Sequence, residues 1–195
     1  FGLGYAKWEK EISGRKVTTT AFIPTDTDAR VLLIEWEGGG TLPLRWSSDL
    51  VLCGDDSSAS RVRIEKSEGF FSASSPENPF PNSKFLVCSS VESTGFTSNR
   101  CLWLQDKTDN NSDTGGFLGI SFVTPSPFVL VCGCDDEEKL RELCSFDAAL
   151  ESYNDTLRSW QGTVSGLKIE TPLPSLNRLI NFWVPYQAIA CRLMG

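Results

Sequence analysis

The chain has 195 residues, 40% of them hydrophobic and 22% charged, so it is able to bury a core of its own as one large domain. Its net charge is −7 and its 18 basic residues are scattered, which argues against a nucleic-acid partner because no basic surface follows the phosphates. No apolar run approaches the roughly 20 residues that a membrane-spanning helix needs, and no secretory signal pattern is present, so we expect no membrane partner.

Short β-type segments separated by turn residues make up the chain from residue 5 to about residue 131. Residues 16–24 alternate with β-branched side chains, residues 30–37 form a stronger apolar strand, and the glycines at 38–40 indicate a turn. Further strands are expected in LPLRWSSDLVLC, RVRIEKSEGFFSAS, KFLVCSSV, RCLWLQ, LGISFVT and FVLVCGC. This pattern favours an antiparallel β-sandwich over residues 1–134.

Two loops interrupt the strand pattern. In SSPENPFPNSKF, residues 74–85, three prolines surround Phe80, whose ring could form the wall of a sugar site; packing within the loop is the favoured alternative. The segment QDKTDNNSDTGG, residues 105–116, is polar and rich in turn residues, so we expect a solvated surface loop.

After residue 134 the pattern becomes that of amphipathic helices. Apolar residues recur at three-to-four spacing in residues 135–162, and the acidic residues at 135–138 suit the positive end of a helix dipole. Ser145 is expected to begin a second helix that ends near Gly162. Residues 166–174 form an extended connector, and Ser175 is expected to cap a final helix.

The final helix carries an apolar stripe that is too broad for an ordinary surface helix. The stripe consists of Leu176, Leu179, Ile180, Trp183, Tyr186, Gln187 and Ala190. Pro185 inside this helix removes a backbone donor and should kink it, at a cost of roughly 3 kcal/mol that packing has to offset. Such a helix requires neighbours on most of its sides.

The chain contains no histidine, which excludes Ser-His-Asp catalysis, Cys-His catalysis and most zinc hydrolysis within these residues. No pair of carboxylates stands out for glycoside chemistry, because the acidic candidates lie where turns and strand edges are expected. These candidates are Asp49, Asp55, Asp56, Asp106 and Glu170. The glycines at 38–40 lack the lysine and the following helix of a phosphate-binding loop. We therefore predict no catalytic residue, no metal and no cofactor in this chain.

The seven cysteines are odd in number and irregular in spacing, which argues against a disulfide framework. Cys132 and Cys134 are too close together for the usual CxxC metal knuckle. We expect buried, reduced thiols in a cytoplasmic protein, with metal or redox chemistry as the alternative. For Trp36, Trp46 and Trp103, which lie in strand patterns, packing in the core is favoured over sugar stacking.

The segment SWQGTVSGLKIETPLPSLNRLINFWVPYQAIACRL, residues 159–193, resembles a junction found in glycoside hydrolase family 94. There a tryptophan, a short strand ending in TP and a helix of the form N-x-W-x-x-Y-Q join an N-terminal β-sandwich to an (α/α)6 barrel. The sequence WVPYQAIACRL is most similar to the phosphorylase-like part of cyclic β-1,2-glucan synthases. The first 37 residues and the NPFPNSKF loop also resemble the family's sandwich, with Phe1 where the family usually has histidine.

This resemblance implies a supersandwich of the galactose-mutarotase type, linker helices in residues 135–173, and the first helix of a barrel in residues 174–195. Family members cleave β-glucosidic bonds with inorganic phosphate as co-substrate and invert the anomeric centre. The family's catalytic acid and phosphate-binding histidines belong to the barrel. The resemblance therefore implies a non-catalytic portion whose sandwich shapes the edge of the active site and helps to form a homodimer, with β-linked gluco-oligosaccharide and the remaining barrel as partners.

Three residues of the final helix match positions that could touch substrate or barrel. Asn181 and Gln187 occupy the polar positions of N-x-W-x-x-Y-Q, where hydrogen bonds that pack the helix are favoured over substrate contact. Arg192 could reach a carboxylate of the barrel. Four apolar residues should lack neighbours in this chain alone: Leu179, Trp183, Tyr186 and Ile189. The second hypothesis is a stand-alone carbohydrate-binding or protein-interaction β-sandwich without enzyme activity.

Overall fold

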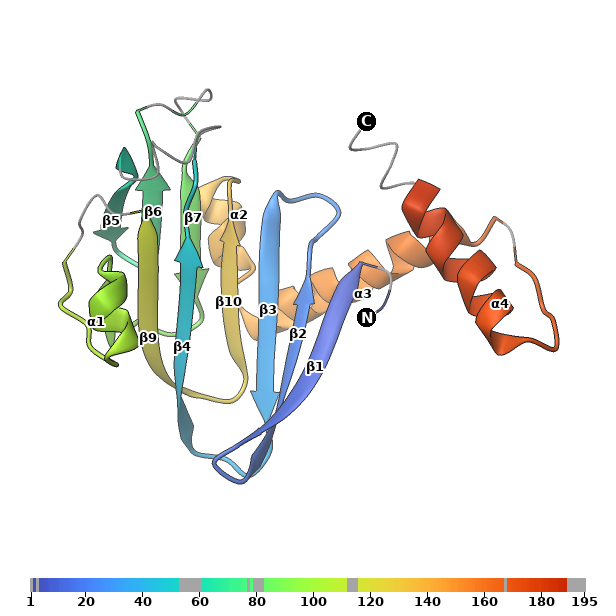
Figure 1. The fold of residues 1–195 in the computed structure, drawn as a ribbon, viewed down its shortest axis with the longest axis horizontal. Helices are drawn as coiled ribbons and strands as arrows, with labels where there is room; N and C mark the ends of the chain where they lie inside the picture. The colour runs from blue at the N-terminus through green and yellow to red at the C-terminus, as the bar shows by residue number, and fades with distance from the viewer. Residues whose placement is uncertain are drawn as a thin grey trace.

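The computed structural model describes residue 2 and residues 4–52, 61–76, 78, 83–111, 116–166 and 168–188. Its larger sheet consists of β1 (Tyr5–Ile12), β2 (Arg15–Phe22), β3 (Ala29–Trp36), β5 (Arg63–Ser67), β6 (Phe70–Ser74), β7 (Phe85–Ser89) and β10 (Phe128–Gly133). Its smaller sheet consists of β4 (Thr41–Asp49), β8 (Gly95–Thr97) and β9 (Phe117–Pro125). All pairings are antiparallel, in the orders β1-β2-β3-β10-β7-β6-β5 and β4-β9-β8 (Figure 1). The predicted mainly-β fold with C-terminal helices is confirmed.

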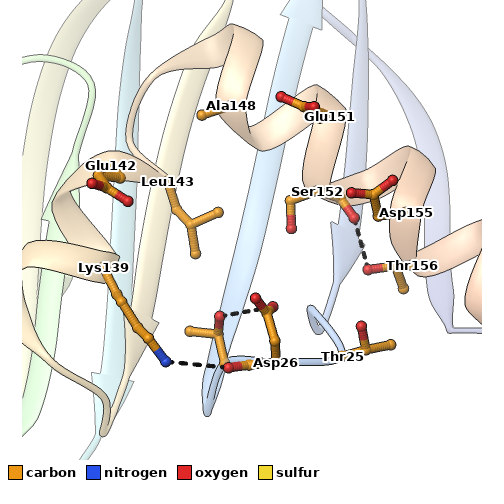
Figure 2. Close-up of a pocket in the computed structure, with 11 residues that line it drawn as sticks. Thr25, Asp26, Lys139, Glu142, Leu143, Ala148, Glu151, Ser152, Asp155 and Thr156 are labelled. Carbon is orange, nitrogen blue, oxygen red and sulfur yellow. Dashed lines mark hydrogen bonds between the residues drawn. The ribbon is translucent and has the colours of Figure 1, made fainter.

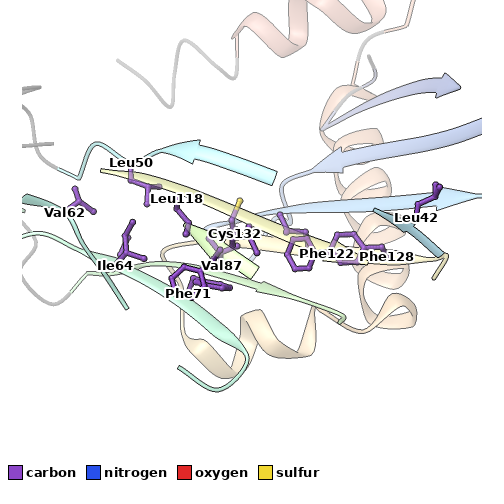
Figure 3. Close-up of a cluster of buried hydrophobic side chains, with 14 of the residues drawn as sticks. Leu42, Leu50, Val62, Ile64, Phe71, Val87, Leu118, Phe122, Phe128 and Cys132 are labelled. Atoms are coloured by element: carbon purple, nitrogen blue, oxygen red, sulfur yellow. The ribbon is translucent and has the colours of Figure 1, made fainter. Parts of the chain in front are cut away.

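Strand β10 is buried along its whole length because both faces of the larger sheet are covered. Phe128 and Leu130 belong to the cluster between the two sheets (Figure 3), whereas Val129 and Val131 belong to the cluster beneath the helices. This arrangement explains why its sequence, FVLVCG, is a continuous apolar run rather than an alternating one. Each fully buried side chain of this size contributes about 1.5–3 kcal/mol through the hydrophobic effect.

Helices α2 (Glu137–Glu142) and α3 (Phe146–Val164) cover the second face of the larger sheet, and α3 passes behind β3, β2 and β1 in Figure 1. The predicted acidic start is confirmed: the Asp136 carboxylate accepts a hydrogen bond of 2.8 Å from the Glu138 backbone N–H. Ser145 stands at the predicted start of α3, but its side chain makes no capping hydrogen bond. The helix continues two residues beyond Gly162 and ends at Val164.

Strand predictions hold over most of the two sheets and are wrong in one segment. RCLWLQ forms a short helix, α1 (Arg100–Leu104), instead of a strand. The reason is local: the Asn99 side chain accepts hydrogen bonds from the backbone N–H groups of Cys101 and Leu102, which caps a helix at this point. RVRIEKSEGFFSAS forms the hairpin of β5 and β6 rather than one strand, and the short strand β8 was not predicted.

The final helix begins with α4 (Pro174–Arg178), continues through a π-helical turn, η2 (Leu179–Trp183), and is α-helical again at residues 184–188. The prediction that Ser175 caps it is wrong, because Leu173 stands at the cap and Pro174 takes the first helical position. Proline suits that position since its fixed φ is already helical and a donor there would have no partner inside the helix.

The π-helical turn ends two residues before Pro185. In this turn the Val184 backbone N–H bonds to the Leu179 carbonyl, five residues earlier. In a regular α-helix the Pro185 ring would collide with the carbonyl of Asn181, and that carbonyl would have no donor. The wider turn is how this helix accommodates the proline, so the predicted disturbance at Pro185 takes the form of a π-helical turn.

Candidate functional site

Two asparagines of the final helix hold the connector that precedes it. The Asn177 side chain accepts a hydrogen bond of 2.9 Å from the Thr171 backbone N–H and donates one of 2.9 Å to the Thr171 carbonyl. Asn181 does the same with Ile169, at 2.9 Å and 2.8 Å. Each amide thus pairs with both backbone groups of one connector residue, as a neighbouring strand would.

These contacts occupy the amide oxygen and nitrogen of Asn181 with backbone groups of Ile169. Gln187 is half-buried on the same helix. Arg192 and Phe80 lie outside the described residues. Asn177 was not predicted from the sequence, although its spacing of four residues from Asn181 places both on one face of a helix.

Apolar side chains of the final helix are exposed on its other sides. Trp183 is 56% exposed, and Leu179 and Tyr186 are exposed as well. The exposure of Leu179 and Trp183 agrees with the prediction that they lack neighbours elsewhere in this chain, whereas Tyr186 has one, and Ile189 lies outside the described residues. The Tyr186 ring lies 6.0 Å from the ring of Trp160 on α3, which gives the helix one contact with the rest of the fold.

A cleft of about 450 Å³ lies between the β2–β3 connection and helices α2 and α3 (Figure 2). It is lined by Thr25, Asp26, Thr27, Lys139, Glu142, Leu143, Ala148, Glu151, Ser152, Asp155 and Thr156. The Lys139 ammonium donates to the Asp26 carbonyl at 3.4 Å and pairs with Asp135 at 3.5 Å, so its charge is already partnered. In the described part of the chain, no three side chains are grouped as metal ligands. We assign no chemistry to this cleft.

A second hollow of about 210 Å³, which we call the sheet groove, lies between the larger sheet and strand β4. Its lining residues are Trp8, Thr19, Leu32, Ile34, Leu44, Arg45, Trp46, Phe122, Phe128 and Leu130. Strand register places Trp8, Thr19, Ile34 and Phe128 side by side on β1, β2, β3 and β10. The groove exists because the smaller sheet has fewer strands than the larger one and leaves part of its inner face uncovered.

Two of the carboxylates that the sequence offered as acid-base candidates are held in surface ion pairs. Asp106 pairs with Arg45, whose guanidinium also lies 3.6 Å from the centre of the Trp103 ring. Asp49 pairs with Arg100. Trp36 and Trp103 are buried as predicted, whereas Trp46 is only half-buried because it lines the sheet groove.

Comparison with known proteins finds a partial similarity. No family model matches the chain. Over 51 residues the chain is 46% identical to the cyclic beta-(1,2)-glucan synthase NdvB of Rhizobium meliloti (strain 1021). The aligned stretch covers 26% of this chain and 2% of that protein, so the chain spans only a small part of the relative's length. The similarity supports a loose link between this chain and that synthase.

None of the described helices combines the length and the apolar character that crossing a membrane requires.

Proposed function

We propose that this chain is a non-catalytic N-terminal portion of a carbohydrate-active enzyme of the glycoside hydrolase family 94 type. The enzyme would be an inverting phosphorylase or glycosyltransferase that acts on β-glucans, with inorganic phosphate as co-substrate, in the cytoplasm. The observation that carries the proposal is the 46% identity over 51 residues to a cyclic beta-(1,2)-glucan synthase. Two antiparallel sheets followed by helices agree with the sandwich and linker of the proposed enzyme.

In this proposal residues 1–134 are the sandwich, residues 135–173 are the linker and residues 174–195 begin an (α/α)6 barrel. The exposed side chains of the final helix support this division, because a barrel would cover them. Phe182, Trp183 and Val184 are each more than half exposed. Covering such apolar surface gains about 25 cal/mol per Å², which favours docking of further helices. The sandwich would shape the edge of the active site and contribute to a homodimer.

The experiment that tests the proposal is to express the chain together with the natural coding sequence that follows Gly195. We expect this longer protein to release a sugar phosphate from β-linked gluco-oligosaccharides and inorganic phosphate, with inversion at the anomeric carbon. Proton NMR of the product distinguishes the two anomers. A stop codon directly after Gly195, or a following sequence without a barrel, would contradict the enzymatic part of the proposal. A carbohydrate-binding or protein-interaction sandwich would then be the function to test.

A further inference from the structure

We infer that the sheet groove binds a neutral, β-linked gluco-oligosaccharide, with the indoles of Trp8 and Trp46 as stacking surfaces. The choice of a glucan as ligand rests on the proposed function, whereas the site itself rests on the geometry and chemistry of the groove. A binding surface of this kind would hold a glucan chain on the sandwich, at a place separate from any barrel.

The two tryptophans approach the groove from different sheets. Trp8 lies on β1, the edge strand of the larger sheet, in the row that continues through Thr19 to Ile34. Trp46 lies on β4, the edge strand of the smaller sheet, and pairs with the buried Ile120 on β9. A ligand in the groove would therefore contact one indole from each sheet.

Trp8 is not needed as a core residue at its present position. It is 49% exposed, although tryptophan is mostly buried in folded proteins. The floor beneath it is formed by buried side chains, among them Phe122 and Phe128. A hollow lined by aromatic and apolar side chains with a few polar groups has the usual lining of a ligand site.

The polar groups of the groove indicate an uncharged ligand. Among the described residues that line it there is no carboxylate, and the one cation, Arg45, is already paired with Asp106. Within the described residues, the hydroxyl of Thr19 and the indole N–H groups of Trp8 and Trp46 have no hydrogen-bond partner in the protein. Such donors can pair with the hydroxyl oxygens of a neutral ligand.

A β-linked glucosyl unit has the matching chemistry. Its substituents are equatorial, so the ring presents a flat face of C–H groups that stacks on an indole, while hydroxyl groups at its rim point sideways. The volume of about 210 Å³ is below the roughly 300–1,000 Å³ of sites for drug-sized ligands, so the groove would hold the chain one sugar ring at a time. A contact surface of this size predicts weak but specific binding.

The test is a calorimetric titration of the 195-residue chain with β-1,2- and β-1,4-linked gluco-oligosaccharides. We expect saturable binding with a dissociation constant on the order of 1 mM. Trp8→Ala should weaken it at least about tenfold because a stacking surface is lost. Thr19→Val keeps the shape of the side chain and should weaken binding by a smaller factor. Trp183→Ala removes an exposed tryptophan outside the groove and should leave binding unchanged.

Circular dichroism melting of Trp8→Ala shows whether the variant folds, and we expect it to do so because half of this side chain is already exposed. Should the variant unfold, shifts of the indole N–H signals on addition of sugar, in the NMR spectrum of the unchanged chain, provide the second readout. Absence of saturable binding to both oligosaccharide series would overturn the inference. The inference would also be overturned if the folded Trp8→Ala variant bound sugar with the same affinity as the unchanged chain. Occupation of the groove by a peptide strand in place of sugar would overturn it as well.

The outcome of this test is separable from that of the proposed function. If the longer protein has phosphorolytic activity but the groove binds no sugar, the proposed function is supported and the inference about the groove is wrong. If the groove binds sugar but the longer protein has no activity, the inference about the groove is supported and the proposed enzymatic function is wrong.

Discussion

Cys88 and Cys144 form a buried thiol pair at the junction of β7 and the helices. Their Sγ atoms lie 3.0 Å apart, and both lie 3.4 Å from the Leu140 carbonyl oxygen. The contact with Cys144, together with burial, raises the pKa of the Cys88 thiol above its ordinary value. Burial raises the pKa of Cys132 as well. Both thiols therefore keep their protons in the folded protein at pH values where an unfolded chain loses them.

This difference predicts that the stability of the protein falls in alkaline solution. A thiol whose pKa is raised on folding contributes fully to the free energy of unfolding below its unfolded pKa of 9.0. This contribution is lost as the pH rises through the folded pKa. Each such thiol should lower the free energy of unfolding by up to about 1.4 kcal/mol per pH unit above that value. Urea titrations at several pH values measure the slope. The slope of Cys88→Ala should be smaller, and an unchanged slope would contradict the assignment to Cys88.

Gly133, at the end of β10, predicts a second effect at the scale of a single residue. A Cβ atom there would lie 2.2 Å from the Asp28 carbonyl oxygen, which belongs to the backbone and cannot move easily. Gly133→Ala should therefore destabilise the protein by on the order of 1–3 kcal/mol. Gly162→Ala is the matched control: it lies in α3 with open space around it and should stabilise by about 0.5–1 kcal/mol. Thermal unfolding of both variants measures the two changes in stability. A change of the same sign in both variants would contradict the close approach at Gly133.

At the scale of elements, the connector and the final helix form one unit. The side-chain amides of Asn177 and Asn181 each bond to both the backbone N–H and the backbone carbonyl of one connector residue. The local hydrogen bonds do not depend on the sheets. Loss of one asparagine should therefore open the connector without unfolding the sandwich, since stability is distributed unevenly over a structure.

We predict that Asn181→Ala speeds hydrogen exchange in residues 168–173 while exchange in β3 and β10 stays unchanged. The free-energy cost is about 1–3 kcal/mol, because the backbone groups of Ile169 lose their partners. Mass spectrometry of exchanged peptides measures both regions. Asn154→Ala is the control, because the side chain of this exposed residue on α3 makes no hydrogen bond within the described residues. An equal loss of protection from hydrogen exchange in the sheets would contradict a local role for the Asn181 hydrogen bonds.

The alternating and apolar strands were predictable from sequence because their hydrophobic residues face a core on one or both sides. The helix at α1 was not, since a single side chain, Asn99, decides it. The cap of α4 was misplaced by two residues, at Ser175 instead of Leu173, because Ser175 suits a cap and Pro174 suits the first helical position. The sheet groove was invisible in the sequence, because it depends on which strands pair and on where the smaller sheet stops.

At the scale of the whole molecule, the structure has three layers: helices, the larger sheet and the smaller sheet, with the final helix beside them (Figure 1). Its exposed apolar residues distinguish this helix from α3, which packs on the sheet. The proposed barrel would cover them, so the effect of a substitution there should depend on the length of the chain.

Trp183→Ala tests this dependence. In the 195-residue chain Trp183 is 56% exposed, and the variant should change the free energy of unfolding by no more than about 0.5 kcal/mol. In the longer protein, with a barrel over the helix, the same variant should cost about 3–5 kcal/mol. Denaturant titrations of both proteins measure the two values. Leu104→Ala on α1 is the control and should be nearly neutral in both. A small effect of Trp183→Ala in both proteins would contradict the proposed covering.

The π-helical turn at Leu179–Trp183 also has a consequence for how this sequence is aligned with others. A π turn contains one residue more than the α-helical turn it replaces, and one residue corresponds to a rotation of about 100° around the helix axis. A helical wheel drawn with a uniform period therefore assigns every residue after Trp183 to the wrong side, and the apolar stripe looks broader than it is. Tyr186 and Gln187 are in phase with the preceding helix only when that extra residue is counted. A relative that lacks Pro185 is expected to have a one-residue gap in this segment, and an alignment that forbids the gap would compare side chains that face different neighbours.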